Sequence, residues 1–138
     1  LDDDVALVAV MWANNEVGTV EPIADIARLC QRRGIPLHCD AVQMLGEQEL
    51  DVAQIPSVAL SAHKVGGPVG VGALVLNRDL AVRPLVHGGG QERDVRSGTL
   101  DAAGIAGFAA ALLAPKVDLC SLRDALIAGV QQAVPEGD

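Results

Sequence analysis

The sequence predicts an α/β fold in which a mainly parallel sheet is flanked by helices. Two observations lead to this prediction: short apolar runs alternate with a helical pattern, and the apolar residues are almost all aliphatic. Half of the 138 residues are hydrophobic, yet there is one Trp, one Phe and no Tyr. Val, Leu, Ile and Ala must therefore build the core, as they do in a parallel sheet under helices.

The first elements can be assigned in order along the chain. Residues 5–11 form a continuous apolar run, typical of a strand covered on both faces. A helix is expected between Pro22, which suits a first turn, and Gly34, which suits a helix end. Strands are expected at 37–40, 57–61 and 71–76, with a short connecting helix at 51–55. This alternation favours right-handed crossovers and a mainly parallel sheet.

The second half of the chain opens with a glycine-rich polar loop at 87–99, a kind of segment that often carries function or contacts. Helical spacing of apolar residues predicts a helix over 100–113, ended by Pro115, with a buried stripe of Ile105, Phe108, Ala109 and Leu112. A last amphipathic helix is marked by Leu119, Leu122, Leu126 and Val130.

Charge and cysteine content limit the classes of partner. Ten basic and eighteen acidic residues give a net charge of -8, which repels phosphate backbones, so we expect no nucleic-acid partner. The odd set Cys30, Cys39 and Cys120 has no metal or redox spacing, which favours a reducing, cytoplasmic setting. The longest uncharged run, 102–115, is shorter than the roughly 20 residues of a membrane span, so we expect no membrane partner.

Three polar residues, Asn15, Asp40 and Lys64, each follow the carboxyl end of a predicted strand. Ligands of open α/β sheets bind outside these strand ends, so we expect the three residues to converge.

Lys64 follows an apolar strand and precedes a run of glycines. A lysine amine is nucleophilic only when deprotonated, a state that a partly desolvated pocket favours, and glycines let backbone approach a ring or a phosphate. A pyridoxal phosphate (PLP) enzyme needs a lysine for its Schiff base and an acid beside the pyridine nitrogen. Lys64 and Asp40 supply both. The alternative is a surface lysine and a loop aspartate, but the apolar strand before each residue favours function.

The histidines leave alternatives open. For His63 we favour a hydrogen bond to a cofactor phosphate, followed by a structural role, and the same two interpretations apply to Ser61. A metal site formed from His38, Asp40 and the other histidines is only weakly supported, because no His-x-His or His-x-x-x-His spacing occurs. His87 could be a loop anchor or a catalytic base, and it stays unassigned.

Four motifs occur in a fixed order over residues 14–100: NNEVG at 14–18, HCDAVQ at 38–43, SAHK at 61–64, and HGGGQER at 87–93 followed by RSGTL at 96–100. This set closely resembles cysteine desulfurases, which are fold-type I PLP enzymes of the class V aminotransferase group. The resemblance covers the middle of such an enzyme. Because the chain also opens at Leu1 without a methionine, we expect residues 1–138 to be a partial PLP-binding large domain of a longer protein, with parts absent on both sides.

The resemblance implies a role for each matching residue. Lys64 matches the Schiff-base lysine and proton carrier, and Asp40 matches the partner of the pyridine nitrogen. Gln43 matches the residue that binds the phenolic oxygen of the ring, and Asn15 matches one near that oxygen and the substrate carboxylate. The matching phosphate ligands are Ser61, His63 and Thr99. In the family Thr99 comes from the neighbouring subunit, so the 87–99 loop would be a homodimer element.

The implied reaction converts L-cysteine to L-alanine and leaves the sulfur as a persulfide on a mobile enzyme cysteine. Its acceptor would be a sulfur-accepting or iron–sulfur scaffold protein. The three cysteines do not match the mobile cysteine and are expected to be small buried residues. Gly66 and Val69 stand where many relatives carry Tyr and Lys. A selenocysteine lyase, an aminotransferase of the same class, or a non-catalytic dimerising piece therefore remain alternatives.

Overall fold

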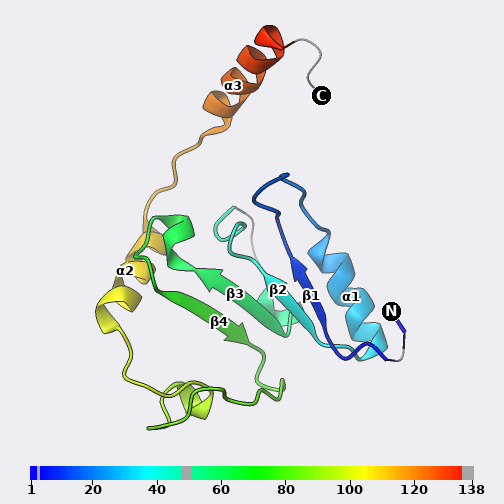
Figure 1. Cartoon of the computed structure of the whole chain (residues 1–138), viewed down its shortest axis with the longest axis vertical. Helices are drawn as coiled ribbons and strands as arrows, with labels where there is room; N and C mark the ends of the chain where they lie inside the picture. The colour runs from blue at the N-terminus through cyan, green and yellow to red at the C-terminus, as the bar shows by residue number, and fades with distance from the viewer. Residues whose placement is uncertain (3, 48–50, 135–138) are drawn as a thin grey trace.

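A computed structural model describes residues 1–2, 4–47 and 51–134. Its four-stranded sheet has the order β1 (Val8–Met11), β2 (Leu37–Asp40), β3 (Ser57–Ser61) and β4 (Gly72–Leu76) (Figure 1). β1, β2 and β3 are parallel, whereas β4 pairs antiparallel with β3. The predicted α/β class with a mainly parallel sheet is thereby confirmed.

The helices lie between and after these strands. The α-helices are α1 (Ile23–Arg33), α2 (Ala102–Leu113) and α3 (Cys120–Ala133). Short 3-10 helices occur at η1 (Val52–Gln54), η2 (Ala62–Val65) and η3 (Glu92–Asp94). No helix in residues 1–2, 4–47 and 51–134 is long and apolar enough to cross a membrane.

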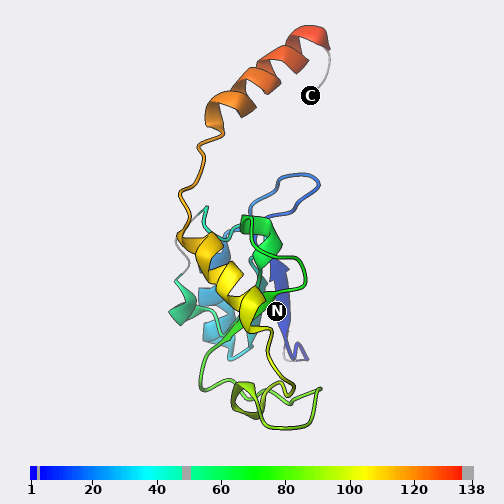
Figure 2. The same cartoon turned by 90° about the vertical axis from the view of Figure 1, so that its left-hand side faces the viewer.

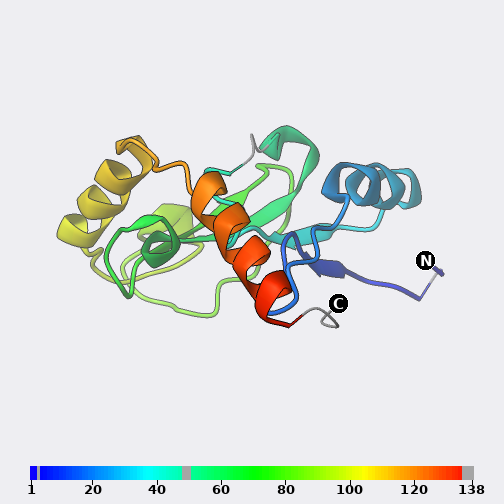
Figure 3. The ribbon, with the colours of Figure 1, turned by 90° about the horizontal axis from the view of Figure 1, so that it is seen from above.

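Helix α1 begins and ends where the sequence predicts. It starts directly after Pro22 and stops at Gly34, whose left-handed conformation (φ 64°) lets its N–H bond the carbonyls of Cys30 and Gln31. Its buried residues Ile23, Ala27 and Cys30 join the core with β-strand residues such as Leu37, Cys39 and Val58. Seen from above, α1 and α2 lie on the same side of the sheet (Figure 3).

Strand β1 differs from the prediction. It covers Val8–Met11 rather than residues 5–11, and its residues are mostly half-buried instead of covered on both faces. β1 lies at the end of the strand order, and Leu7, just before it, is 56% exposed. The apolar run therefore indicated a strand, but the described chain covers it on one side only.

The two C-terminal helices form as predicted but bury less than their apolar patterns indicate. In α2 Phe108 and Gly104 are buried, whereas Ile105 and Leu112 are each 45% exposed and Ala109 is exposed too, so the predicted stripe is wrong for these three residues. Helix α3 has no buried residue, and Figures 1 and 2 show it standing away from the sheet after an extended connection.

The 87–99 loop lies at the end of the molecule opposite the carboxyl ends of β1 to β3 (Figures 1 and 2). It is held by its own hydrogen bonds: the Ser97 hydroxyl accepts the Gly90 N–H at 3.2 Å, and the Gln91 side chain accepts the Gly98 N–H at 2.9 Å. Glu92, Arg93 and Asp94 all have positive φ, between 49° and 62°. Three consecutive left-handed non-glycine residues are unfavourable, so this loop stores backbone strain.

Candidate functional site

The site residues are positioned by the parallel register of the first three strands. Met11 of β1 pairs with Asp40 of β2, and Asp40 pairs with Ala59 of β3. The pairing continues past the strands, since the Trp12 N–H donates to the Asp40 carbonyl at 2.8 Å. The segments that carry Asn15, Asp40 and Lys64 therefore leave the sheet at the same end of its parallel strands (Figure 1), and the convergence of the three side chains stays a prediction.

The carboxylate of Asp40 is oriented by its own turn. Its Oδ1 accepts the Val42 N–H at 3.0 Å, a bond typical of an Asp that opens a turn. Asp40 is half-buried and lies on the sheet face opposite Cys39, because successive side chains of a strand point to opposite faces. One carboxylate oxygen is thus fixed by the backbone while the group stays accessible from that face.

Lys64 lies in η2, in a loop that closes on Ala62. The Ala62 N–H donates to the Val71 carbonyl at 3.0 Å, and the Ala62 carbonyl accepts the N–H groups of Gly66 and Gly67. Gly66 is left-handed with φ 81°, and a Cβ on Gly67 would lie 2.9 Å from the Ala62 oxygen. These two glycines therefore have a definite backbone role: they let the chain fold tightly back just after Lys64.

Ser61 and His63 are hydrogen-bonded to each other between the end of β3 and Lys64. The Ser61 Oγ lies 2.8 Å from the His63 Nδ1, and the His63 side chain is exposed. A hydroxyl and an imidazole side by side offer O–H and N–H donors, which suit an anion such as a phosphate.

Three further predicted site residues, Gln43, Asn15 and Thr99, lie in turns and loops outside the strands. Gln43 is half-buried in the turn that follows Asp40. Asn15 is exposed in the loop after β1, where the neighbouring Asn14 accepts the N–H groups of Glu16 and Val17. Thr99 is exposed in the 87–99 loop, and most of this loop lies at the end of the molecule opposite the carboxyl ends of β1 to β3 (Figure 2).

Two expectations about the surroundings need correction. The Lys64 side chain is exposed, so the described residues do not form the desolvated pocket that we predicted around it. Cys30 and Cys39 are buried as expected, but Cys120 is exposed at the start of α3.

Burial, with a smaller effect of the Asp40 charge, raises the pKa of the Cys39 thiol from 9.0 to about 11.

The metal alternative has no support in the part of the chain that the structure describes. No three His, Cys, Asp or Glu side chains gather there in a way that could hold a metal ion. His38 bonds instead to the Ser57 hydroxyl, with 2.8 Å between Nδ1 and Oγ, and His63 bonds to Ser61.

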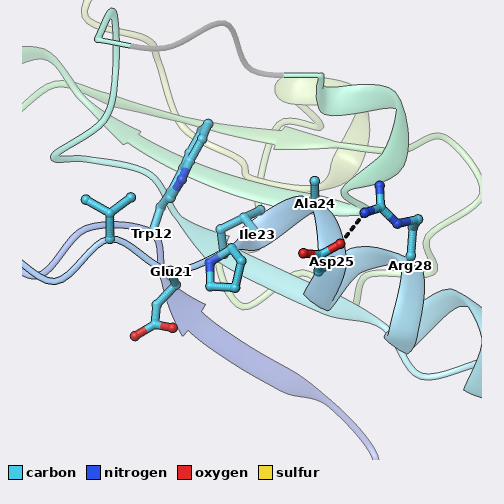
Figure 4. A pocket seen from close by; sticks show the side chains of 8 residues that line it. Trp12, Glu21, Ile23, Ala24, Asp25 and Arg28 are labelled. Carbon is cyan, nitrogen blue, oxygen red and sulfur yellow. Dashed lines mark hydrogen bonds and ion pairs between the residues drawn. The ribbon is translucent and has the colours of Figure 1, made fainter.

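A shallow depression at the start of α1 is lined by none of the predicted site residues. Its lining includes Trp12, Pro22 and Ile23 together with the acidic Glu21 and Asp25 (Figure 4). Asp25 pairs with Arg28 along the helix, which leaves no unpaired cation among the lining residues for a phosphate. This depression therefore does not compete with the strand edge as the site.

One feature of the site was missed in the sequence. The Val42 N–H that fixes the Asp40 carboxylate was not anticipated, although an Asp at the start of a turn commonly accepts the N–H two residues later. That signal was present in the HCDAVQ motif.

Comparisons with known proteins identify the family. Residues 1–117 match the family model for Aminotransferase class-V. An IscS-like cysteine desulfurase of Mycobacterium tuberculosis is 50% identical over 137 residues, which cover 93% of this chain and 35% of that protein. Cysteine desulfurase IscS of Clostridium botulinum is 45% identical over an alignment 145 residues long, gaps included, which covers 99% of this chain and 36% of that protein.

A solved structure shows the same arrangement. The structure described as SspA in complex with cysteine matches with a TM-score of 0.86 at 34% identity, over 96% of this chain and 39% of that one. The chain spans about a third of the length of the curated relatives it matches. With its fold, its motifs and these relatives in agreement, the chain belongs to the class-V aminotransferase family of PLP-dependent enzymes, and the relatives that it matches are cysteine desulfurases.

Proposed function

We propose that residues 1–138 form part of the PLP-binding large domain of a cysteine desulfurase, and that Lys64 binds the cofactor covalently. The observation that carries this proposal is the arrangement at one sheet edge. The Asp40 carboxylate ends β2, and the Ser61–His63 pair and Lys64 follow the end of the adjacent β3. The acid, the anion-binding pair and the amine therefore lie at the ends of two neighbouring strands or just after them.

The chemistry of these residues fits PLP. Lys64 offers an exposed amine to the aldehyde, and Asp40 offers a carboxylate to the ring nitrogen. Ser61 and His63 offer a donor pair to the phosphate, and Gln43 and Asn15 offer side-chain amides to the phenolic oxygen. When bound, PLP supplies an electron sink for charge that develops at the α-carbon of an amino acid.

The residues of this chain would divide the remaining work. The negative charge of the Asp40 carboxylate would stabilise positive charge at the ring nitrogen, and the Val42 N–H fixes this carboxylate at the end of β2. The Lys64 amine would remove a proton from the α-carbon of the substrate and return it later. Ser61 and His63 keep the phosphate at one position, so the reacting atoms stay within reach of Lys64.

The substrate in this proposal is L-cysteine, which is converted to L-alanine while a cysteine elsewhere in the protein takes the sulfur. The names of the relatives and the structure of SspA in complex with cysteine support this choice. Cys39 is unsuited to the sulfur transfer, since its thiol is fully buried and its raised pKa, about 11, disfavours the thiolate. The protein would act in the cytoplasm and pass sulfur to an acceptor or an iron–sulfur scaffold protein.

We also propose a homodimer in which the 87–99 loop reaches the site of the partner. Two observations support it: the loop lies at the end of the molecule opposite the carboxyl ends of β1 to β3 (Figures 1 and 2), and Thr99 is exposed. Thr99 would then bind the phosphate held by Ser61 and His63 of the other copy.

The lysine content of the chain makes the central claim easy to test. Lys64 and Lys116 are its two lysines. The intact protein is incubated with PLP, reduced with borohydride and mapped by mass spectrometry. We expect the label on Lys64, loss of the label in Lys64→Arg, and no loss in the matched control Lys116→Arg. Equal labelling of both lysines and the amino terminus would contradict the proposal.

The reaction itself is tested separately on the intact protein. With L-cysteine and a thiol reductant, we expect alanine and sulfide in equal amounts, and neither product from Lys64→Arg. If Lys64 is labelled but alanine does not form from L-cysteine, the cofactor site stands and the desulfurase assignment is wrong.

A further inference from the structure

Two glycines of α2 face the loop that carries Lys64. A Cβ on Gly104 would lie 2.4 Å from Val71 Cγ2, and a Cβ on Gly107 would lie 2.8 Å from Pro68 Cγ. Carbon atoms in favourable contact are about 3.5–4.0 Å apart, so neither position has room for a larger residue. Gly104 and Gly107, which we call the α2 seam, thus bring the helix backbone close to this loop.

The seam contacts a closed segment of chain. Ala62 and Val71 tie the two ends of this segment together through the 3.0 Å bond from the Ala62 N–H, and Ala62 is fully buried. Lys64 lies near its start, and Pro68 and Val71, the residues that touch the seam, lie after it. Displacing Pro68 or Val71 therefore moves the segment in which Lys64 lies.

The composition of α2 indicates that these glycines are there for packing. Glycine is among the weakest helix formers, and α2 is otherwise rich in Ala and Leu. The start of α2 is held as well, because Asp101 accepts the Gly104 N–H at 2.9 Å, and Phe108 beside the seam is 7% exposed. α2 is thus anchored against η2, and the loop rests on its glycine side.

We infer that the α2 seam positions Lys64 for its bond to the cofactor by supporting Pro68 and Val71 from behind. Gly104 and Gly107 are positioning residues, since neither lies in the motif that carries the amine. The part of this inference that concerns the cofactor rests on the proposed function of Lys64. The part that concerns the loop does not.

The chain offers a matched pair of glycine variants. Gly107→Ala places a methyl group against the rigid Pro68 ring, whereas a Cβ on Gly129 of α3 would meet nothing within 4 Å. Both substitutions favour helix formation equally, so any difference between Gly107→Ala and Gly129→Ala reports the contact. The double variant Gly107→Ala with Pro68→Ala removes the ring atoms that the new methyl would strike, and it serves as the rescue.

The first measurement does not involve the cofactor. In the intact protein, hydrogen exchange of the Gly66 and Gly67 amides, which bond to the Ala62 carbonyl, is compared among the variants by mass spectrometry. We expect exchange to be at least about fivefold faster in Gly107→Ala and unchanged in Gly129→Ala. Identical exchange in the two variants would overturn the inference, whether or not Lys64 binds PLP.

The second measurement follows the amine. We expect the rate of covalent PLP capture at Lys64, relative to Lys116, to fall about tenfold or more in Gly107→Ala and to recover in the double variant. Faster exchange with unchanged capture would show that the seam packs the loop without positioning Lys64, and the inference would be wrong. If wild-type Lys64 captures no PLP, the proposed function fails, and so does the seam's role in binding the cofactor. Exchange then decides only whether the seam supports the loop.

Discussion

At the scale of single residues, the half-buried Asp40 carboxylate makes a backbone hydrogen bond at the carboxyl end of β2. Its Oδ1 accepts the Val42 N–H, and within the described residues its other oxygen has no hydrogen bond. Asn at this position can keep the bond to Val42 but carries no charge for the ring nitrogen of PLP.

Asp40→Asn should therefore keep the fold and the bound cofactor while lowering desulfurase turnover about 100-fold or more. Turnover is measured as alanine formed from L-cysteine, and cofactor content by visible absorbance. Asp51→Asn is the control, because Asp51 accepts the N–H of Ala53 two residues on in the same way but belongs to the η1 turn. Equal turnover in the two variants would refute the role of Asp40.

The cysteines differ in their environments, and this gives a second residue-scale prediction. At pH 8 a maleimide should modify Cys120 rapidly and leave Cys30 and Cys39 unmodified until the protein unfolds, because only Cys120 is exposed. Peptide mapping after timed labelling measures this. Modification of Cys39 as fast as Cys120 in the folded protein would contradict its burial.

The raised pKa of Cys39 makes the stability of the folded protein fall at high pH. The unfolded chain ionises this thiol near 9.0 and the folded chain near 11, so the stability from the buried neutral thiol is present below pH 9 and is lost between about pH 9 and 11. Cys39→Ala should show a smaller loss of stability across this range, measured as urea midpoints at pH 8 and pH 10.5.

At the scale of elements, α1 and β2 hold the core while α3 contributes nothing to it. Leu37 of β2 is 1% exposed, whereas Leu126 of α3 is 68% exposed. Leu37→Ala should lower the free energy of unfolding by about 2–5 kcal/mol through lost burial and a cavity.

The matched variant Leu126→Ala should change the stability of the sheet by no more than about 0.5 kcal/mol. Both values come from urea denaturation followed by Trp12 fluorescence, since Trp12 lies in the core. A similar loss for the two variants would mean that α3 packs on the core in solution.

The elements that sequence predicted best are those with local signals. Strands β2 and β3 were predicted to the residue, and each directly follows a proline, Pro36 or Pro56. Helix α1 was predictable because Pro22 and Gly34 mark its ends. Which face each element buries was harder to predict. The patterns of β1 and α3 indicated burial, but burial depends on neighbours that local spacing cannot supply.

The candidate site was predictable in part for the same reason. Parallel strands deliver Asn15, Asp40 and Lys64 to one edge, so their order along the chain was enough to group them. The exposure of Lys64 and the glycine contacts of α2 could not be predicted, because both depend on distant segments packing together.

At the scale of the whole molecule, the proposal that Thr99 serves the site of the partner can be tested by mixing variants. In a dimer of Lys64→Arg and Thr99→Asp copies, one site would carry both substitutions and the other neither. Mixing two inactive variants should therefore restore about one quarter of the wild-type activity after random exchange of subunits.

Activity per protomer and the dimer fraction, from sedimentation, are measured on the same mixtures. A mixture of Lys64→Arg with Lys64→Arg plus Thr99→Asp is the control and should stay inactive. No recovery in the first mixture, despite exchange of subunits, would mean that Thr99 serves the site of its own chain.

Strand β4 explains why the 87–99 loop lies at the end of the molecule opposite the Lys64 loop. It is the strand of the described sheet that runs against the other three, so it carries the chain from the Lys64 loop back to the opposite end, where residues 87–99 lie (Figure 1). In the proposed homodimer, this single reversal of direction would make each cofactor site depend on a second molecule. The protein should then lose cofactor on dilution below the dissociation constant of its dimer, and the cellular concentration of the protein itself would regulate how many sites are filled.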